Sequence, residues 1–218
     1  TDTRDDNVIF SESNEGRLYW SVAVGSTADS LASSSILEAG VWAHVVTTVE
    51  GTTFKMYKDG ALVASSTSGQ EPASLTRAYH WLGRSAWSSD DYFDGTIAYL
   101  RFWHGEALSE SQVAELYAER IDPTPVPTLV PTTTLAPTLS PTVVRDPDHE
   151  FDFRGCSDSS ATVDTGVDGS GITATAVNGA TCSSEGMVFD GSDDYVDVTP
   201  WPFGGTLTFE TVSYTHLT

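Results

Sequence analysis

The sequence predicts an all-β protein, an antiparallel sandwich with one short helix. Short runs rich in β-branched and aromatic residues recur through residues 1–121, and turn residues separate them. Many short strands at close spacing are typical of antiparallel sandwiches and barrels. Apolar residues make up 39% of the chain, which is enough to fill a core although the formal net charge is -21.

Six segments of the N-terminal part have the composition of strands. They are residues 17–24, 42–50, 54–58, 61–65, 79–83 and 93–103. Asp59-Gly60 separates the third segment from the fourth, and it predicts a tight hairpin because glycine accepts positive φ. Alternation is expected to place two sets of side chains on opposite faces of the last segment: Ile97, Tyr99 and Arg101 against Ala98, Leu100 and Phe102.

One helix is predicted after these strands. Ser109 and Gln112 stand at the spacing of a capping box, in which the two residues bind backbone N–H groups of the first turn. Val113 and Leu116 follow at helical spacing. The helix is expected to be short, to end before Pro123 and to cover the rim of the sandwich.

A linker divides the chain at residues 122–147. Seven of the ten prolines fall in this stretch, interleaved with Thr and Leu. Proline lacks the backbone N–H and fixes φ, so the stretch is expected to be an extended spacer of about 3 Å per residue. Ser and Thr beside proline also suit an O-glycosylated stalk, and a bare flexible linker is the alternative.

The C-terminal part, residues 148–218, contains further strand-like runs near Phe151, between residues 187 and 198, and from Leu207. It also holds both cysteines of the chain, Cys156 and Cys182, within sequence rich in Gly, Ser, Thr and Asp. Such a pair is oxidised in an extracellular protein, so the sequence favours a disulfide over free thiols. Without nearby histidines the pair does not fit a zinc site.

The charge of the chain excludes several classes of partner. There are 31 acidic and 10 basic residues, whereas binding of nucleic acid or of anionic lipid needs clustered cations. No stretch comes close to the ~20 apolar residues of a membrane helix, so membrane insertion is not expected. A solvated acidic surface is the simplest interpretation of the charge, and binding of divalent cations is the alternative.

Three motifs carry a family resemblance. They are Trp42-Ala43-His44-Val45-Val46 with the hairpin at Asp59-Gly60, Phe93-Asp94-Gly95-Thr96-Ile97 with the helix after it, and Phe189-Asp190-Gly191 with Asp194-Tyr195-Val196. In that order they resemble the central strand and hairpin, the last strand and closing helix, and the first strand of laminin-G-like domains of the concanavalin-A-like lectin/glucanase superfamily. The resemblance implies a jelly-roll sandwich with one short C-terminal helix in each domain.

The order of these motifs bears on the domain organisation. The first strand of the family comes last here, after the linker. Residues 1–121 are therefore interpreted as a domain lacking its N-terminal strands, and residues 148–218 as the N-terminal part of a second domain in a tandem array. Because the two parts are complementary, the second is also expected to complete the first as a circularly permuted sandwich.

Residues 211–218 leave two interpretations open. They are similar to a translated sequencing adapter, which would make them non-native. Val212 and Tyr214 alternate as in a strand, however, and a further strand of the family is expected at this point.

The segment between residues 84 and 92 is the most site-like part of the sequence. Arg84, Trp87 and Tyr92 are predicted to bind a ligand, since sugars stack on aromatic rings while polar groups fix their hydroxyls. Asp90 and Asp91 are the candidate metal ligands, because Ca²⁺ binds carboxylate and carbonyl oxygens in flexible loops. The structural alternative is a loop whose tryptophan packs on the sandwich and whose aspartates face water.

Catalysis is not expected. The glucanases of the resembled superfamily need a nucleophile and an acid/base on one strand, about 5 Å apart. Glu150 and Asp152 have a suitable spacing along a strand. Arg154, however, stands where a third carboxylate is expected, and the run borders the linker.

The sequence thus predicts a non-catalytic module of a secreted or cell-surface multidomain protein. The resemblance and the linker favour binding of carbohydrate or of extracellular proteins, as in adhesion. Two alternatives stand beside it: an accessory domain of a glycan-active enzyme, and a structural spacer array that only extends reach. No cofactor is implied apart from Ca²⁺ at Asp90 and Asp91.

Overall fold

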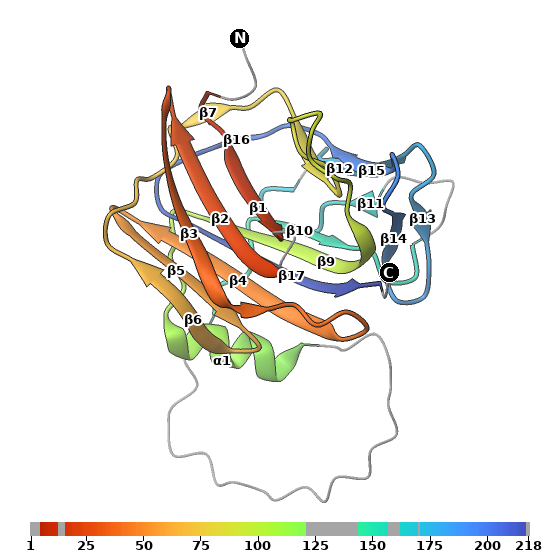
Figure 1. Ribbon diagram of the computed structural model, residues 1–218, viewed down its shortest axis with the longest axis horizontal. Coiled ribbons are helices and arrows are strands. Elements are labelled where there is room, and N and C mark those ends of the chain that lie inside the picture. Colours follow the sequence, from red (N-terminus) through yellow and green to blue (C-terminus); the bar gives the residue numbers. More distant parts are fainter. Residues whose placement is uncertain (1–4, 13–15, 121–143, 157–161, 170, 217–218) are drawn as a thin grey trace, which may run out of the picture.

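The computed structural model describes residues 5–12, 16–120, 144–156, 162–169 and 171–216. Within them the chain forms antiparallel sheets and one short helix, as Figure 1 shows. The all-β prediction is therefore confirmed. Most of the expected linker lies outside the described residues, and only residues 144–147 of it lie within them.

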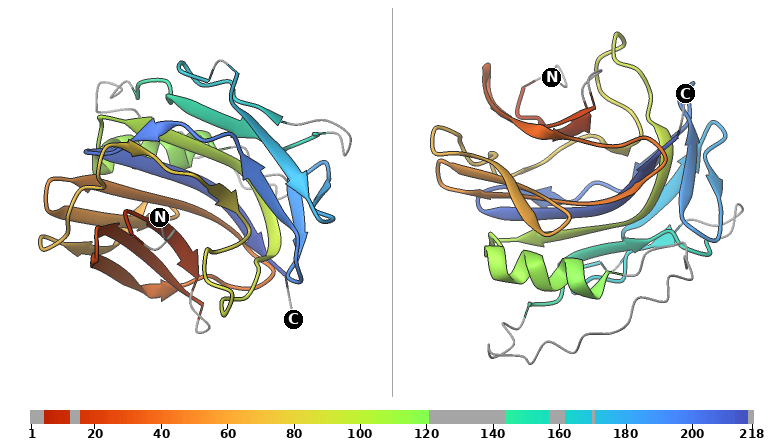
Figure 2. Two further views of the ribbon diagram at one scale, coloured as in Figure 1. Left: turned by 90° about the horizontal axis from the view of Figure 1, so that it is seen from above. Right: turned by 60° about the horizontal axis from the view of Figure 1, so that its bottom comes forward.

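The largest sheet in the described residues has eight strands. Its path runs through β13 (Thr181–Cys182), β14 (Met187–Asp190), β9 (Asp94–His104), β17 (Leu207–Thr215), β4 (Trp42–Glu50), β5 (Thr53–Lys58) and β6 (Ala61–Ser66). Beside this path, β10 (His149–Asp152) pairs with β9. The sheet curves, and Figure 2 shows β1–β3 on its concave side and the helix on its convex side.

Three smaller sheets complete the described part of the fold. They contain β1 (Val8–Glu12), β2 (Arg17–Val24) and β3 (Thr27–Ile36); β11 (Thr162–Val163), β12 (Thr173–Val177), β15 (Tyr195–Val198) and β8 (His80–Leu82); and β16 (Pro202–Phe203) with β7 (Leu75–Thr76). The sequence missed β3, whose run has few β-branched or aromatic residues. This strand forms by pairing along the whole of β2.

The C-terminal strand lies inside the large sheet. β17 is inserted between β4 and β9, with Thr211 opposite Val45 on one side and opposite Leu100 on the other. Residues 211–215 take part in this strand. β14 pairs with β9 and β15 with β8, so strands from both sides of the linker share sheets.

The interior between the layers is also filled from both parts of the chain. Trp20 and Phe54 come from the N-terminal part, Phe151 and Phe189 from the C-terminal part, and each is at most 2% exposed. Burying one such side chain stabilises a fold by ~2 kcal/mol. Each part thus supplies apolar surface that the other part covers.

The hairpin between β5 and β6 turns at Asp59-Gly60, as predicted. Both residues have positive φ, 51° and 77°, which is the twist of a type I′ turn. A Cβ at Gly60 would lie 2.9 Å from Cδ1 of Tyr117. The glycine is therefore needed both for the turn and for the close approach of the helix.

The helix, α1 (Glu110–Glu119), begins at the predicted capping box. The hydroxyl of Ser109 accepts a hydrogen bond from the N–H of Gln112, whose side chain accepts one from the N–H of Ser109. Val113 and Leu116 are buried against the convex face of the large sheet. The predicted helix is thus confirmed, but it packs on the convex face of the large sheet and not on the rim of the sandwich.

The expected alternation along β9 is wrong at one point. The register between β17 and β9 shifts at a β-bulge, where Val212 lies opposite Tyr99 and Ser213 opposite Ile97. Ala98 is the extra residue and packs with Tyr99, while Ile97 turns toward the core of the sandwich. Beyond a bulge, each side chain of the strand points to the opposite face of the sheet from the one that simple alternation predicts. The pattern of apolar residues alone does not reveal where a bulge lies.

The predicted disulfide is present. Cys156 and Cys182 are bonded, with 5.5 Å between their Cα atoms, and the bond lies wholly within the C-terminal part. Among the described residues, no helix is long and apolar enough to cross a membrane.

Candidate functional site

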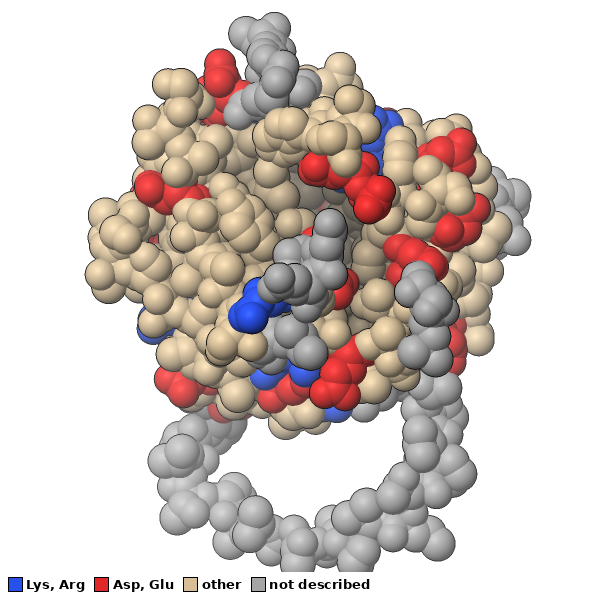
Figure 3. Space-filling view, viewed as in Figure 1, with Lys and Arg blue, Asp and Glu red and all other residues tan. Residues whose placement is uncertain are grey.

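A cleft of about 1090 Å³ opens between the concave face of the large sheet and the sheet of β1–β3. Leu100, Phe102 and Phe209 line it from the large sheet, and Phe10 and Trp20 from β1 and β2. Figure 3 shows this face of the molecule hollowed, with acidic side chains along the border. Small-molecule sites usually occupy ~300–1,000 Å³, so the cleft is large enough for a ligand of several sugar rings.

All five residues that the sequence singled out line this cleft. Arg84, Trp87 and Tyr92 are half-buried, whereas Asp90 and Asp91 are exposed. They lie on the loop that leads from β8 to β9. The structure therefore brings the predicted ligand-binding and metal-binding residues together at one border of the cleft.

This loop is held by its own hydrogen bonds. The hydroxyl of Ser85 donates to Oδ2 of Asp90 at 2.7 Å and accepts from the N–H of Trp87 at 2.9 Å. The N–H of Asp90 in turn donates to the carbonyl of Trp87 at 3.2 Å. Asp90 thus fixes the turn that presents Trp87.

The acidic pair does not by itself make a calcium site. Ca²⁺ takes six to eight oxygen ligands, and Asp90 already accepts from Ser85. Nowhere in the described residues do three or more His, Cys, Asp or Glu side chains gather as metal ligands. Asp90 and Asp91 can supply two carboxylates, and main-chain carbonyls or water would have to supply the other ligands.

Arg84 lies against aromatic residues that the sequence analysis did not single out. Its guanidinium carbon is 4.1 Å from the ring centre of Trp81, 4.7 Å from that of Tyr195 and 5.8 Å from that of Tyr92. Tyr79 stacks on Trp81 with 4.5 Å between ring centres and is 51% exposed. We call Tyr79, Trp81, Arg84 and Tyr195 the aromatic platform.

Part of this platform has a sequence signal. Tyr79 and Trp81 are two residues apart at a strand, which is the spacing that places side chains on one face. Tyr195 has no such signal, because it comes from β15 beyond the linker. It reaches the platform through the pairing of β15 with β8, in which Val196 lies opposite Leu82.

His80 lies between these two aromatic residues in the sequence and contacts a different group of rings. Its ring makes edge contacts with Trp201 and Phe203, with 4.3 Å and 5.5 Å between ring centres. Within the described part of the chain, neither nitrogen of this buried ring has a hydrogen-bond partner. Burial, and then the charges of Arg77 and His149, lower the pKa of His80 to about 4, so the ring is neutral at pH 7.

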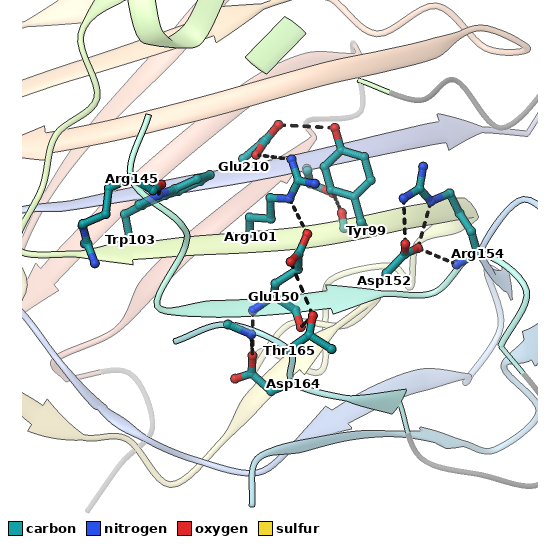
Figure 4. Close-up of polar contacts among 12 residues, drawn as sticks. Tyr99, Arg101, Trp103, Arg145, Glu150, Asp152, Arg154, Asp164, Thr165 and Glu210 are labelled. Carbon is teal, nitrogen blue, oxygen red and sulfur yellow. Dashed lines mark hydrogen bonds and ion pairs between the residues drawn. The ribbon is translucent and has the colours of Figure 1, made fainter. Parts of the chain in front are cut away.

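The two carboxylates considered for catalysis are both held by arginines, as Figure 4 shows. Nε of Arg101 donates to Glu150 at 2.7 Å, and Arg154 donates to both oxygens of Asp152 at 2.8 and 2.6 Å. Burial alone would raise the pKa of Asp152, but the hydrogen bonds from Arg154 lower it below its usual value. Neither carboxylate lines the cleft, and the lowered pKa of Asp152 does not suit an acid catalyst.

Glu210 is the centre of a buried network of polar side chains beside Arg101 and Glu150 in the large sheet (Figure 4). Its carboxylate is fully buried, lies 2.8 Å from Nε2 of His44 and 3.6 Å from Arg101, and accepts from the Tyr99 hydroxyl at 3.3 Å. Burial, together with the Glu210 charge, raises the pKa of Tyr99. Because Glu210 belongs to β17 and its partners to β4 and β9, the network joins the two parts of the chain.

Comparison with known proteins gives one match. A laminin G model of the concanavalin A-like lectin/glucanases superfamily matches residues 1–114, just over half of the 218 residues. No curated protein and no solved structure matches the chain. The matched residues include the loop with Arg84 and Trp87, but not Tyr195 or Glu210. The chain belongs to the laminin G domains of the concanavalin A-like lectin/glucanases superfamily.

Proposed function

We propose that this chain is a non-catalytic glycan-binding module of a secreted or cell-surface protein. The observation that carries the proposal is the cleft, which is lined by Trp87 and by three members of the aromatic platform: Tyr79, Trp81 and Arg84. Sugars bind by stacking their apolar faces on aromatic rings while nearby polar groups fix their hydroxyls. The disulfide supports an oxidising location, such as the outside of the cell.

Two observations favour this function over catalysis and over a purely structural spacer. The arginine partners of Glu150 and Asp152 support a binding role over a catalytic one. An adhesion module that binds another protein would use the same exposed rings. An accessory domain of a glycan-active enzyme would also bind glycans, whereas a pure spacer has no use for a cleft of this volume.

The test is binding of the purified chain to an array of oligosaccharides and extracellular proteins, with Ca²⁺ and with a chelator. We expect binding to one class of oligosaccharide. Trp87→Ala should weaken it at least tenfold, because the variant removes a ring from the border of the cleft. Trp42→Ala is the matched control, since Trp42 is also half-buried but contacts Tyr214 and does not line the cleft.

Silence across all oligosaccharides, or binding that Trp87→Ala leaves unchanged, would contradict the proposal. The chelator tests the predicted metal ligands separately. Loss of binding in chelator, reproduced by Asp91→Asn, would support Ca²⁺ at Asp90 and Asp91. Unchanged binding in both would remove these two residues from the proposal as metal ligands.

A further inference from the structure

We infer that the cleft binds an extended basic peptide, which adds to the free edge of β1 as a further strand. This site is separate from the proposed glycan site, because it uses a different border of the cleft from the aromatic platform. Every residue of β1 and of β8 lines the cleft. In the described part of the fold, β1 and β8 are each the end strand of their sheet.

The register of β1 shows which of its main-chain groups are free. The N–H of Ala23, next to β2, donates to the carbonyl of Asn7 at 2.8 Å. In an antiparallel ladder every second residue bonds to the partner strand, so the N–H and C=O groups of Val8, Phe10 and Glu12 point away from β2. Within the described residues none of these groups has a hydrogen-bond partner, so β1 offers an open edge to the cleft.

The floor of the cleft beside this edge is apolar. The ring centre of Phe10 lies 5.5 Å from that of Phe209 in the large sheet. Phe209 and Ile97 both line the cleft and are only partly buried. A strand beside β1 would lie ~4.8 Å from it and would direct every second side chain onto this floor.

The charge of the cleft favours a basic strand. Of the two arginines that line it, Arg77 is engaged, because its three nitrogens donate to main-chain carbonyls at 2.6, 3.1 and 3.2 Å. Burial raises the pKa of the Glu12 carboxyl despite the hydrogen bond from Thr215, and a cation beside Glu12 would offset this burial. The acidic residues that line the cleft are Asp5, Asp6, Glu12, Asp90, Asp91 and Asp94.

These observations define the sequence of the expected peptide. All strand pairs of the described residues are antiparallel, so the added strand is expected to run antiparallel to β1. Its residues opposite Val8, Phe10 and Glu12 then exchange hydrogen bonds with β1, and their side chains face the floor. The residue opposite Glu12 comes first and is basic, and the two opposite Phe10 and Val8 are apolar.

The experiment measures fluorescence anisotropy of a labelled peptide with the core Lys-Thr-Val-Thr-Val, added to the full chain in physiological salt. We expect saturable binding, which should weaken at least tenfold when glutamate replaces the lysine. N-methylation of the lysine and valine amides should also weaken it at least tenfold, because these amides face β1. N-methylation of the two threonine amides is the matched control and should leave binding unchanged, because these amides face away from β1.

Variants of the chain test the same edge. Val8→Pro removes one free N–H but none of the bonds between β1 and β2, so it should weaken the peptide roughly fivefold while the chain stays folded. Any binding of oligosaccharides should be unchanged in this variant. Glu12→Gln should reduce the preference for lysine over glutamate. Glu38→Gln is its matched control, since Glu38 is exposed, lies outside the cleft and undergoes the same change of charge.

Three outcomes would overturn the inference, and none of them bears on the binding of glycans. The first is the absence of binding by either peptide up to about 1 mM. The second is binding that survives N-methylation of the lysine and valine amides, or that both patterns of methylation weaken equally, because the peptide would then not pair with β1 as an antiparallel strand. The third is equal binding of the lysine and glutamate peptides, which would exclude a basic ligand.

Discussion

At the scale of single residues, His80 stands out among the described residues, because both of its ring nitrogens are buried and neither has a hydrogen-bond partner. Its folded-state pKa of about 4 lies below the ordinary value of 6.5. Between these two pH values the unfolded chain takes up a proton that the folded chain does not. The free energy of unfolding therefore falls as pH drops below 6.5, and the loss levels off below pH 4.

We predict that His80→Leu removes the fall in the free energy of unfolding that protonation of His80 causes between pH 6.5 and pH 4. The shift is worth up to ~3 kcal/mol, since one pKa unit corresponds to ~1.4 kcal/mol. Chemical denaturation at pH 7.0, 5.5 and 4.5 should show a smaller loss in the variant than in the unmodified chain. Equal losses would mean that the His80 ring becomes hydrated and charged without disturbing the fold.

The residues of the candidate site divide into those that local sequence predicts and those that it does not. Arg84, Trp87 and Asp90 were predicted because aromatic and charged residues gather in one short segment. Tyr195 and Glu210 were missed, because their partners lie more than a hundred residues away in the sequence. A single sequence carries no signal for such pairs.

At the scale of elements, the same division holds. β2 and β4 were predicted with the bounds that the structure gives them, because their β-branched and aromatic residues mark them locally. β7, β11, β13 and β16 have two residues each and exist only through their pairing partners. Propensity cannot find strands of this length.

The capping box of α1 gives a prediction at this scale. Ser109→Ala removes the acceptor for the N–H of Gln112 and should lower the free energy of unfolding by about 1 kcal/mol. Ser88→Ala is the control, an exposed serine of the loop before β9 whose hydroxyl has no hydrogen-bond partner among the described residues. Urea denaturation of both variants distinguishes them, and equal stability would show that the cap contributes nothing.

At the scale of the whole molecule, we propose that residues 5–120 and 144–216 are the back and the front of laminin G domains that complete one another. Three observations support this: β17 lies between β4 and β9, Glu210 is buried among partners from the other part, and each part fills the core of the other. The aromatic platform is also built from both parts of the chain, since Tyr195 of the C-terminal part contacts Arg84 of the N-terminal part.

The most direct measurement cuts the linker and asks whether the parts stay together. A specific protease site is introduced within residues 128–136, the chain is cleaved, and the product is passed through a size-exclusion column without denaturant. The disulfide cannot hold the parts together, because both of its cysteines belong to the C-terminal part. We expect the two fragments to elute as one species that unfolds in one transition and binds the same oligosaccharides as the uncut chain. Elution as two separate fragments under native conditions would contradict the claim that both parts build one sandwich and one site.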